Sequence, residues 1–155
     1  MGKKIFCRIL AASILVAGLI PQMSCSDAGK QVELESITVY KSPTCGCCAK
    51  WVDHLQANGF EVETIDIQDM SAVKAEAGIS RQLASCHTAK AGGYVIEGHV
   101  PADDIKRLLK ERLDVVGLTV PGMPMGSPGM EGHRKDNYDV LTFTRTGETS
   151  VFSRH

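Results

Sequence analysis

The chain has 155 residues, of which 43% are hydrophobic and 23% charged, and its formal net charge is −1. This composition is typical of one globular domain with room for a processed segment. No run of like charges indicates a surface for RNA or DNA, which argues against a nucleic-acid-binding function.

Residues 1–28 are predicted to be a signal peptide. They open with a basic stretch and continue with an uncharged, mostly apolar run over 9–20, which is shorter than the roughly 20 residues of a transmembrane helix. Small residues favour cleavage after Ala28, which leaves 29–155 as the mature domain. Lipoprotein processing at Cys25 is the alternative, and both routes predict an exported protein.

The mature chain is expected to begin with a strand, a helix and a second strand. Residues 36–40 alternate and are β-branched, which predicts the first strand. Apolar spacing predicts a helix over 49–58 that stops at Asn58-Gly59. Residues 60–67 alternate as a second strand, and a second helix is expected over 70–77.

The second half contains further elements and an irregular segment. Tyr94 to Glu97 is predicted to be a third strand region, and Val100 to Asp104 opens a helix with proline and acids in its first turn. A loop dense in Pro, Gly and Met follows over 117–132, and the stretches 139–144 and 149–152 are predicted to form a hairpin. The order indicates an α/β fold with a thioredoxin/glutaredoxin-like core and a C-terminal extension made of this loop and hairpin.

Three cysteines, Cys45, Cys47 and Cys48, lie between the first strand and the first helix. A helix N-terminus favours thiolate over thiol, and the thiolate is both the nucleophile and the metal ligand. Cys45 and Cys48 have the spacing of a redox-active pair, whereas a third thiol at Cys47 invites scrambling and suits a thiophilic metal such as Cu(I) or Zn(II).

Cys86 is expected to join these three cysteines. In a thioredoxin-like unit the segment that enters the third strand passes beside the helix-start thiols, so Cys86 and His87 would bring a fourth sulfur and an imidazole. The alternative is a small buried cysteine. A scaffold of two structural disulfides is disfavoured, because bridges between adjacent cysteines or across Cys-x-Cys are strained and only one bridge to Cys86 is comfortable.

Met123, Met125 and Met130 lie in the Pro/Gly loop at a spacing that forms no helix face. Thioethers are poor zinc ligands and good Cu(I) ligands, so these residues are expected to bind or shield copper, with ordinary packing as the alternative. His99 is either a partner that supports the site or a surface histidine, and His54 is expected to face solvent.

Four motifs in order resemble those of a known family: Cys45-Gly-Cys-Cys with Trp51, Ser85-Cys-His-Thr-Ala89, Glu97-Gly-His-Val-Pro101 and the stretch 120–131. Together they resemble the CopG-type periplasmic copper-resistance proteins, long catalogued as a domain of unknown function. The resemblance implies a thioredoxin-like fold, a role in bacterial copper resistance, and an oxidoreductase activity that cycles copper between Cu(I) and Cu(II). It also implies the copper-binding sulfurs, which are those of Cys45, Cys47, Cys48 and Cys86.

We therefore expect a periplasmic protein that binds several Cu(I) ions through these cysteines, with Met123, Met125 and His87 completing or shielding the site. Three functions stay open: a copper oxidoreductase with an electron-transfer partner, a non-catalytic copper chaperone or sequestration protein, and a thiol-disulfide oxidoreductase. The methionine loop and Cys47 argue against the third. No nucleic acid and no membrane span are expected.

Overall fold

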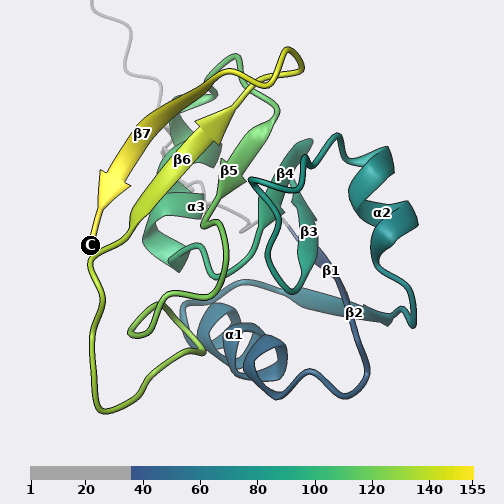
Figure 1. Cartoon of the computed structure of the whole chain (residues 1–155), viewed down its shortest axis with the longest axis vertical. Coiled ribbons are helices and arrows are strands. Elements are labelled where there is room, and N and C mark those ends of the chain that lie inside the picture. Colours follow the sequence, from purple (N-terminus) through teal and green to yellow (C-terminus); the bar gives the residue numbers. More distant parts are fainter. Residues whose placement is uncertain (1–35) are drawn as a thin grey trace, which may run out of the picture. The chain divides into compact units, whose positions relative to one another are not determined.

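The computed structural model describes residues 36–155, which Figure 1 shows in colour. The predicted signal peptide and the alternative lipoprotein site at Cys25 lie outside these residues. Within the described range, no helix is long and apolar enough to cross a membrane.

The described residues form seven strands and three helices. The elements are, in order, β1 (Ile37–Lys41), α1 (Gly46–Ala57), β2 (Val62–Asp66), α2 (Ser71–Glu76), β3 (Thr88–Ala91), β4 (Tyr94–Glu97), α3 (Ala102–Glu111), β5 (Gly117–Thr119), β6 (Asp139–Phe143) and β7 (Thr149–Arg154).

The strands of the described range join one sheet in the order β2-β1-β3-β4-β5-β6-β7. The pairs β1·β2 and β4·β5 are parallel, and the other neighbours are antiparallel. Parallel neighbours need a crossover connection, which helices α1 and α3 supply. The predicted C-terminal hairpin is present as β6–β7, and it continues the core sheet at one edge.

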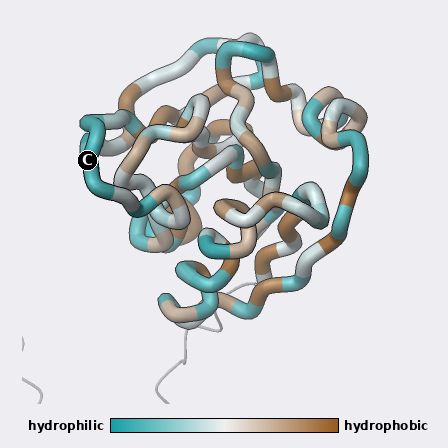
Figure 2. The backbone as a smooth tube through the Cα atoms, turned by 60° about the horizontal axis from the view of Figure 1, so that its bottom comes forward, coloured by the Kyte–Doolittle hydropathy of each residue, from teal (hydrophilic) through white to brown (hydrophobic). Residues whose placement is uncertain are grey.

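Alternation along the strands gives the sheet one apolar face. Ile37 and Val39 of β1 are fully buried there, as are Ala89 and Ile96, which pair across β3 and β4. Figure 2 shows such apolar positions, in brown, recurring along the backbone. Helices α1 and α3 cover this face and share one core with it, to which they contribute Trp51, Val52, Leu55, Ile105 and Leu108.

Helix α2 lies against the opposite face and buries no residue of its own. Thr88 and Glu97 pair across β3 and β4 and alternate with the core-facing residues, so their side chains point away from α1. Lys74 of α2 donates hydrogen bonds to both of them. This polar contact attaches α2 to the sheet.

Helix α1 begins three residues earlier than predicted, because Cys45 caps it. The Sγ of Cys45 accepts a hydrogen bond from the backbone N–H of Cys48 at 3.4 Å, so the helix starts at Gly46. It ends as predicted at Asn58, before a glycine with φ of +89° at position 59. Its buried residues recur at the spacing i, i+3, i+4 and i+7, and they are Cys48, Trp51, Val52 and Leu55.

Two short strands depart from the sequence predictions. Strand β3 begins inside the stretch 85–89, for which the sequence analysis gives no strand bounds, and β5 occupies the start of the predicted loop 117–132. Strand β5 has three residues and opens with glycine, so no local pattern identifies it. Its pairing with β4 on one side and β6 on the other defines it.

The remainder of the Met/Pro/Gly-rich loop runs past α1 before it returns to the sheet (Figure 1). Gly129 approaches the helix so closely that a Cβ there would lie 2.6 Å from the carbonyl oxygen of Cys47 and 2.9 Å from the backbone nitrogen of Trp51. The N–H of Gly122 donates to the carbonyl of Ala84 at 3.1 Å. The loop thus packs against both segments that carry cysteines.

Gly117→Ala is expected to lower the free energy of unfolding by about 1–3 kcal/mol, the usual cost of overpacking. A Cβ at this position would lie 1.7 Å from the carbonyl oxygen of Val95, so β5 must move away from β4 to accept it. Urea unfolding followed by circular dichroism measures the loss. Gly46→Ala is the control, because a Cβ there meets nothing within 4 Å. Equal stability of Gly117→Ala and the parent chain would contradict the close approach.

Candidate metal centre

Three of the predicted site cysteines lie at the start of helix α1. Cys45 is the N-cap, and Cys47 and Cys48 belong to the first turn. Free backbone N–H groups and the helix dipole place partial positive charge there, which favours thiolates. The first turn carries no acidic residue that would offset this field.

Cys45 and Cys48 form a disulfide, whereas Cys47 and Cys86 are free. The bridge to Cys86 that the spacing would allow is not formed. One helical turn brings the Cα atoms of Cys45 and Cys48 to 5.3 Å, within the range that a disulfide spans without backbone movement. Their separation agrees with the redox spacing of this pair.

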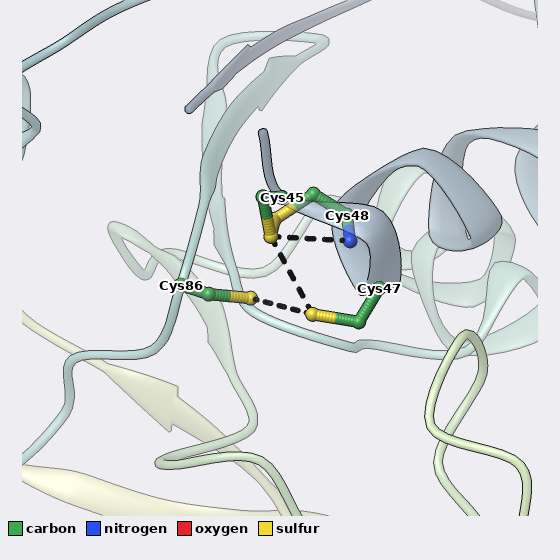
Figure 3. A group of neighbouring side chains, drawn as sticks. All are labelled: Cys45, Cys47, Cys48 and Cys86. Carbon is green, nitrogen blue, oxygen red and sulfur yellow. Dashed lines mark hydrogen bonds between the residues drawn. A yellow bond between two sulfur atoms is a disulfide. The ribbon is translucent and has the colours of Figure 1, made fainter. Parts of the chain in front are cut away.

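Cys86 points from the segment before β3 toward the sulfurs of helix α1 (Figure 3). The Sγ of Cys47 lies 3.4 Å from that of Cys45 and 3.9 Å from that of Cys86. All four sulfurs of Cys45, Cys47, Cys48 and Cys86 lie within 4.8 Å of one another. The structure therefore brings the four predicted sulfurs together.

Two buried imidazoles flank the sulfur of Cys86. His87 Nδ1 lies 3.3 Å from it and His99 Nε2 lies 3.1 Å from it, and both histidines are fully buried. His99 Nδ1 lies 2.8 Å from the carbonyl oxygen of Pro128, which can only accept, so Nδ1 carries the proton and Nε2 faces Cys86 with a lone pair. The ring of His87 packs against that of Trp51, and its Nε2 has no hydrogen-bond partner in the described part of the chain.

Burial sets the protonation of this group. Burial and the neighbouring Cys47 raise the pKa of the Cys86 thiol to about 12. Burial also lowers the pKa of His99, and it lowers the pKa of His87 well below its usual value, with help from His99 and from the charge of Lys74. The metal-free site therefore holds a protonated Cys86 thiol that donates to a neutral His99.

A buried carboxylate fixes the Cys86–His87 pair from both sides. Glu97 accepts the backbone N–H of Ser85 at 2.6 Å and the hydroxyl of Thr88 at 2.6 Å. Lys74 forms an ion pair with the same carboxylate. Burial raises the pKa of Glu97, against the effects of Lys74 and the two donors. The sequence predicts neither Glu97 nor Lys74 as a site residue, because it does not show which charged residues are buried.

The methionine loop borders the site through its backbone. The side chain of Met123 is 52% exposed. The backbone of Met125 exchanges hydrogen bonds with Asp136, and its methyl group lies against Gly132. The predicted ligand roles of both methionines thus stay predictions. Pro128, which holds His99, is the contact that ties this loop to the site.

His99 and His54 differ from the simplest interpretation of the sequence. The surface alternative for His99 is wrong, since the side chain is fully buried beside Cys86. His54 does not simply face solvent: it is half-buried, and its Nε2 accepts the backbone N–H of Ala102 at the start of α3. Helix α3 has no other side-chain cap, because its N-cap residue is Pro101. This acceptor role explains the burial of His54.

The donor set determines what the centre can hold. Reduction of the disulfide would place four thiolates within bridging distance, a set that suits soft ions such as Cu(I). A second set, formed by Cys86, His87 and His99, offers one sulfur and two nitrogens, again within 4.8 Å of one another. Cys86 belongs to both sets.

Comparisons with known proteins match most of the described chain. A glutaredoxin profile matches residues 37–81, which confirms the predicted thioredoxin/glutaredoxin-like α/β fold. A profile described as a protein of unknown function, DUF411, matches residues 83–130. No curated protein matches the chain.

Two solved structures share 50% sequence identity with this chain. One is "Copper resistance protein copG- Form 2", which covers 79% of this chain and 99% of its own and superposes with a TM-score of 0.75. The other is Form 1 of the same protein, which covers 79% of this chain and 98% of its own and has a TM-score of 0.74.

The metal-free protein is expected to lose stability as the pH falls below 6.5. Burial holds the pKa values of His54, His87 and His99 below the 6.5 of an exposed histidine. Below that pH the unfolded chain binds protons that the folded chain does not, so folding becomes less favourable. The raised pKa of Glu97 has the opposite effect on stability, but it is one group against three histidines. Urea midpoints at about pH 7.5 and about pH 5.5 measure the change.

His54→Gln keeps an acceptor for the backbone of α3 and removes one titrating group, so it should make the pH dependence shallower. The exposed His133→Gln is the matched control and should leave the dependence unchanged. A urea midpoint that rises on acidification would show that the buried histidines do not govern stability in this range.

Lys74→Met is expected to destabilise the fold by about 3–5 kcal/mol, because it leaves the carboxylate of Glu97 buried without its cation. The double variant Lys74→Met/Glu97→Leu should regain part of this loss. Lys90→Met removes a comparable pair with Glu76 that is exposed on both sides, and it should cost about 0–1 kcal/mol. Urea unfolding compares the variants, and equal losses for Lys74→Met and Lys90→Met would refute a buried ion pair.

Proposed function

The chain belongs to the family of the CopG copper resistance proteins, and we propose that it binds copper as Cu(I) through its four clustered cysteines in the periplasm. The single observation that carries this proposal is the convergence of Cys45, Cys47, Cys48 and Cys86 within 4.8 Å. The proposed cargo is several Cu(I) ions per chain, since bridging thiolates let a few sulfurs hold more than one soft ion.

The disulfide state of the site bears on how copper is bound. Cys45 and Cys48 must be reduced before they can bind metal, so in the described state two of the four sulfurs are not available as thiolate ligands. Reduction yields two thiolates at a helix N-terminus, where the dipole stabilises their charge. Copper binding then replaces the proton of the Cys86 thiol with a soft cation.

Residues around the sulfurs are proposed to complete and shield the centre. His87 lies beside Cys86 and supplies a nitrogen from the buried side. Met123 and Met125 come from the loop that packs over the start of α1, and thioethers are suitable additional ligands for Cu(I). His99, held by Pro128, keeps its lone pair directed at the Cys86 sulfur.

A redox activity fits the same residues. The thiolates of Cys45 and Cys48 can each give one electron to one Cu(II) ion, which forms the disulfide and two Cu(I) ions without loss or gain of atoms. Regeneration then needs a two-electron donor, and a periplasmic electron-transfer protein is the proposed partner. In this scheme the chain is a copper oxidoreductase, and the reduced Cys45–Cys48 pair stores the two electrons.

Two other functions remain candidates. A copper chaperone or sequestration protein would use the same sulfurs without turnover. The Cys45–Cys48 disulfide is the observation that favours a thiol-disulfide oxidoreductase. Cys47, which is a free thiol 3.4 Å from the Cys45 sulfur, disfavours it, because that thiol can attack the disulfide. The proposed export is common to all three functions, whether the signal peptide over 1–28 is removed or the chain is anchored as a lipoprotein at Cys25.

Cys47→Ser is expected to lower the number of Cu(I) ions bound by the reduced protein, because Cys47 lies between the other sulfurs and would bridge them. Anaerobic titration with Cu(I) and metal analysis of the isolated complex measure the stoichiometry. Thr44→Ala, an exposed neighbour in the same turn, is the control and should bind as the parent does. An unchanged copper count in Cys47→Ser would show that the ligand assignment is wrong.

Controlled oxidation of the loaded protein separates the candidate functions. A Cu(II) electron paramagnetic resonance signal that appears and disappears reversibly, without loss of metal, supports the oxidoreductase. Release of copper on oxidation, without a reversible Cu(II) signal, supports a chaperone or a thiol-disulfide exchanger.

A further inference from the structure

The described state leaves one complete set of metal ligands after the disulfide has removed two sulfurs. Cys45 and Cys48 cannot act as thiolate ligands while they are bonded to each other. Cys86, His87 and His99 are unaffected by that bond, and their ligand atoms lie within 4.8 Å of one another. The site therefore changes its chemistry with its oxidation state: four free sulfurs become two, those of Cys47 and Cys86, and Cys86 keeps the two imidazoles as neighbours.

We propose that the oxidised protein, with the Cys45–Cys48 disulfide closed, binds one divalent ion of the Zn(II) class through Cys86, His87 and His99. This inference concerns a different oxidation state and a different class of metal from the proposed Cu(I) site. Imidazole and a single thiolate suit borderline divalent ions, whereas a cluster of thiolates suits Cu(I).

The separations of the ligand atoms fit such an ion. Zinc lies about 2.3 Å from sulfur and about 2.0–2.1 Å from nitrogen, so tetrahedral geometry places a sulfur and a nitrogen ligand about 3.6 Å apart. Cys86 Sγ lies 3.3 Å from His87 Nδ1 and 3.1 Å from His99 Nε2. Each pair needs to open by about half an ångström or less to admit the ion.

The protonation of His99 is already that of a metal ligand. Its Nδ1–H donates to the carbonyl of Pro128, which leaves the Nε2 lone pair facing the sulfur. Histidine ligands usually donate their other ring N–H to a carbonyl or carboxylate in this way. The histidine orientation is thus set before any ion arrives, which lowers the cost of ordering the site.

His87 and Cys86 are held equally firmly. The backbone of Ser85 and the side chain of Thr88, on either side of this pair, both donate to Glu97. The ring of His87 is fixed against Trp51, with a centroid distance of 4.3 Å. Three protein ligands leave a fourth position for water or another ligand, as in zinc sites that are not purely structural.

The test uses Co(II) as the probe, because its absorption reports thiolate coordination and it does not oxidise thiols under anaerobic conditions. The full mature chain with the disulfide intact, verified by mass, is titrated with Co(II) and then with Zn(II). We expect one Co(II) per chain with a sulfur-to-cobalt charge-transfer band, and displacement of that ion by Zn(II). Cys86→Ser should lose the band, and His99→Gln should raise the Kd at least about tenfold.

Two control variants keep the outcome interpretable. His133→Gln removes an exposed histidine outside the group and should bind Co(II) as the parent does. The double variant Cys45→Ser/Cys48→Ser should retain the Co(II) site while losing Cu(I) ions under reducing conditions. That variant separates the Cu(I) proposal from the divalent-ion proposal. If it still bound the full number of Cu(I) ions, the four-sulfur Cu(I) site would be refuted and the divalent-ion site would be unaffected.

The proposal is overturned by any of three results. These are the absence of a charge-transfer band in the oxidised parent chain, an unchanged band in folded Cys86→Ser, and loss of Co(II) binding in folded Cys45→Ser/Cys48→Ser. Circular dichroism and the fluorescence of Trp51 establish folding for each variant.

Discussion

The arrangement of the site depends on one buried carboxylate. Glu97 accepts hydrogen bonds from Ser85 and Thr88, and so it holds the two residues between them against the start of helix α1. Lys74 compensates the charge of Glu97 and, by the same contact, attaches helix α2 to the sheet. An ion pair buried at this depth adds little net stability, but removal of one partner is costly. Its contribution is therefore best understood as the placement of Cys86.

Placement alone does not make four sulfurs compatible with one another. Four thiolates in a partly buried space repel strongly, and burial with the neighbouring Cys47 already raises the pKa of the Cys86 thiol to about 12. The site has two ways to relieve this repulsion: a disulfide, which removes two charges, or soft cations, which neutralise them. The described structure shows the first, and family membership supports the second. Disulfide formation and the proposed copper binding would thus compete for the same sulfurs.

Sequence patterns predicted the secondary structure correctly where local interactions determine it. The strand, turn and helix around Cys45 follow from alternation and helical spacing, and the position of Cys86 follows from the fold class that this order indicates. Strand β5 was missed because three residues beginning with glycine have no pattern of their own. The burial of His99 was left open, and the pairing of Lys74 with Glu97 was missed, for a related reason. Each arises from contacts between segments distant in sequence, and local spacing does not encode them.

Cys86 is shared by the two candidate ligand sets. Among the described cysteines it is the only one away from the start of helix α1, and it belongs to both candidate ligand sets. When Cys45 and Cys48 are reduced, Cys86 is surrounded by sulfurs, which bind soft ions best. When the disulfide is closed, the two neutral imidazoles beside Cys86 are the better ligands, and they suit a borderline ion. In the proposed assignments, the oxidation state of Cys45 and Cys48 selects the metal that Cys86 binds, while Glu97 and Pro128 hold the residues around Cys86 in place.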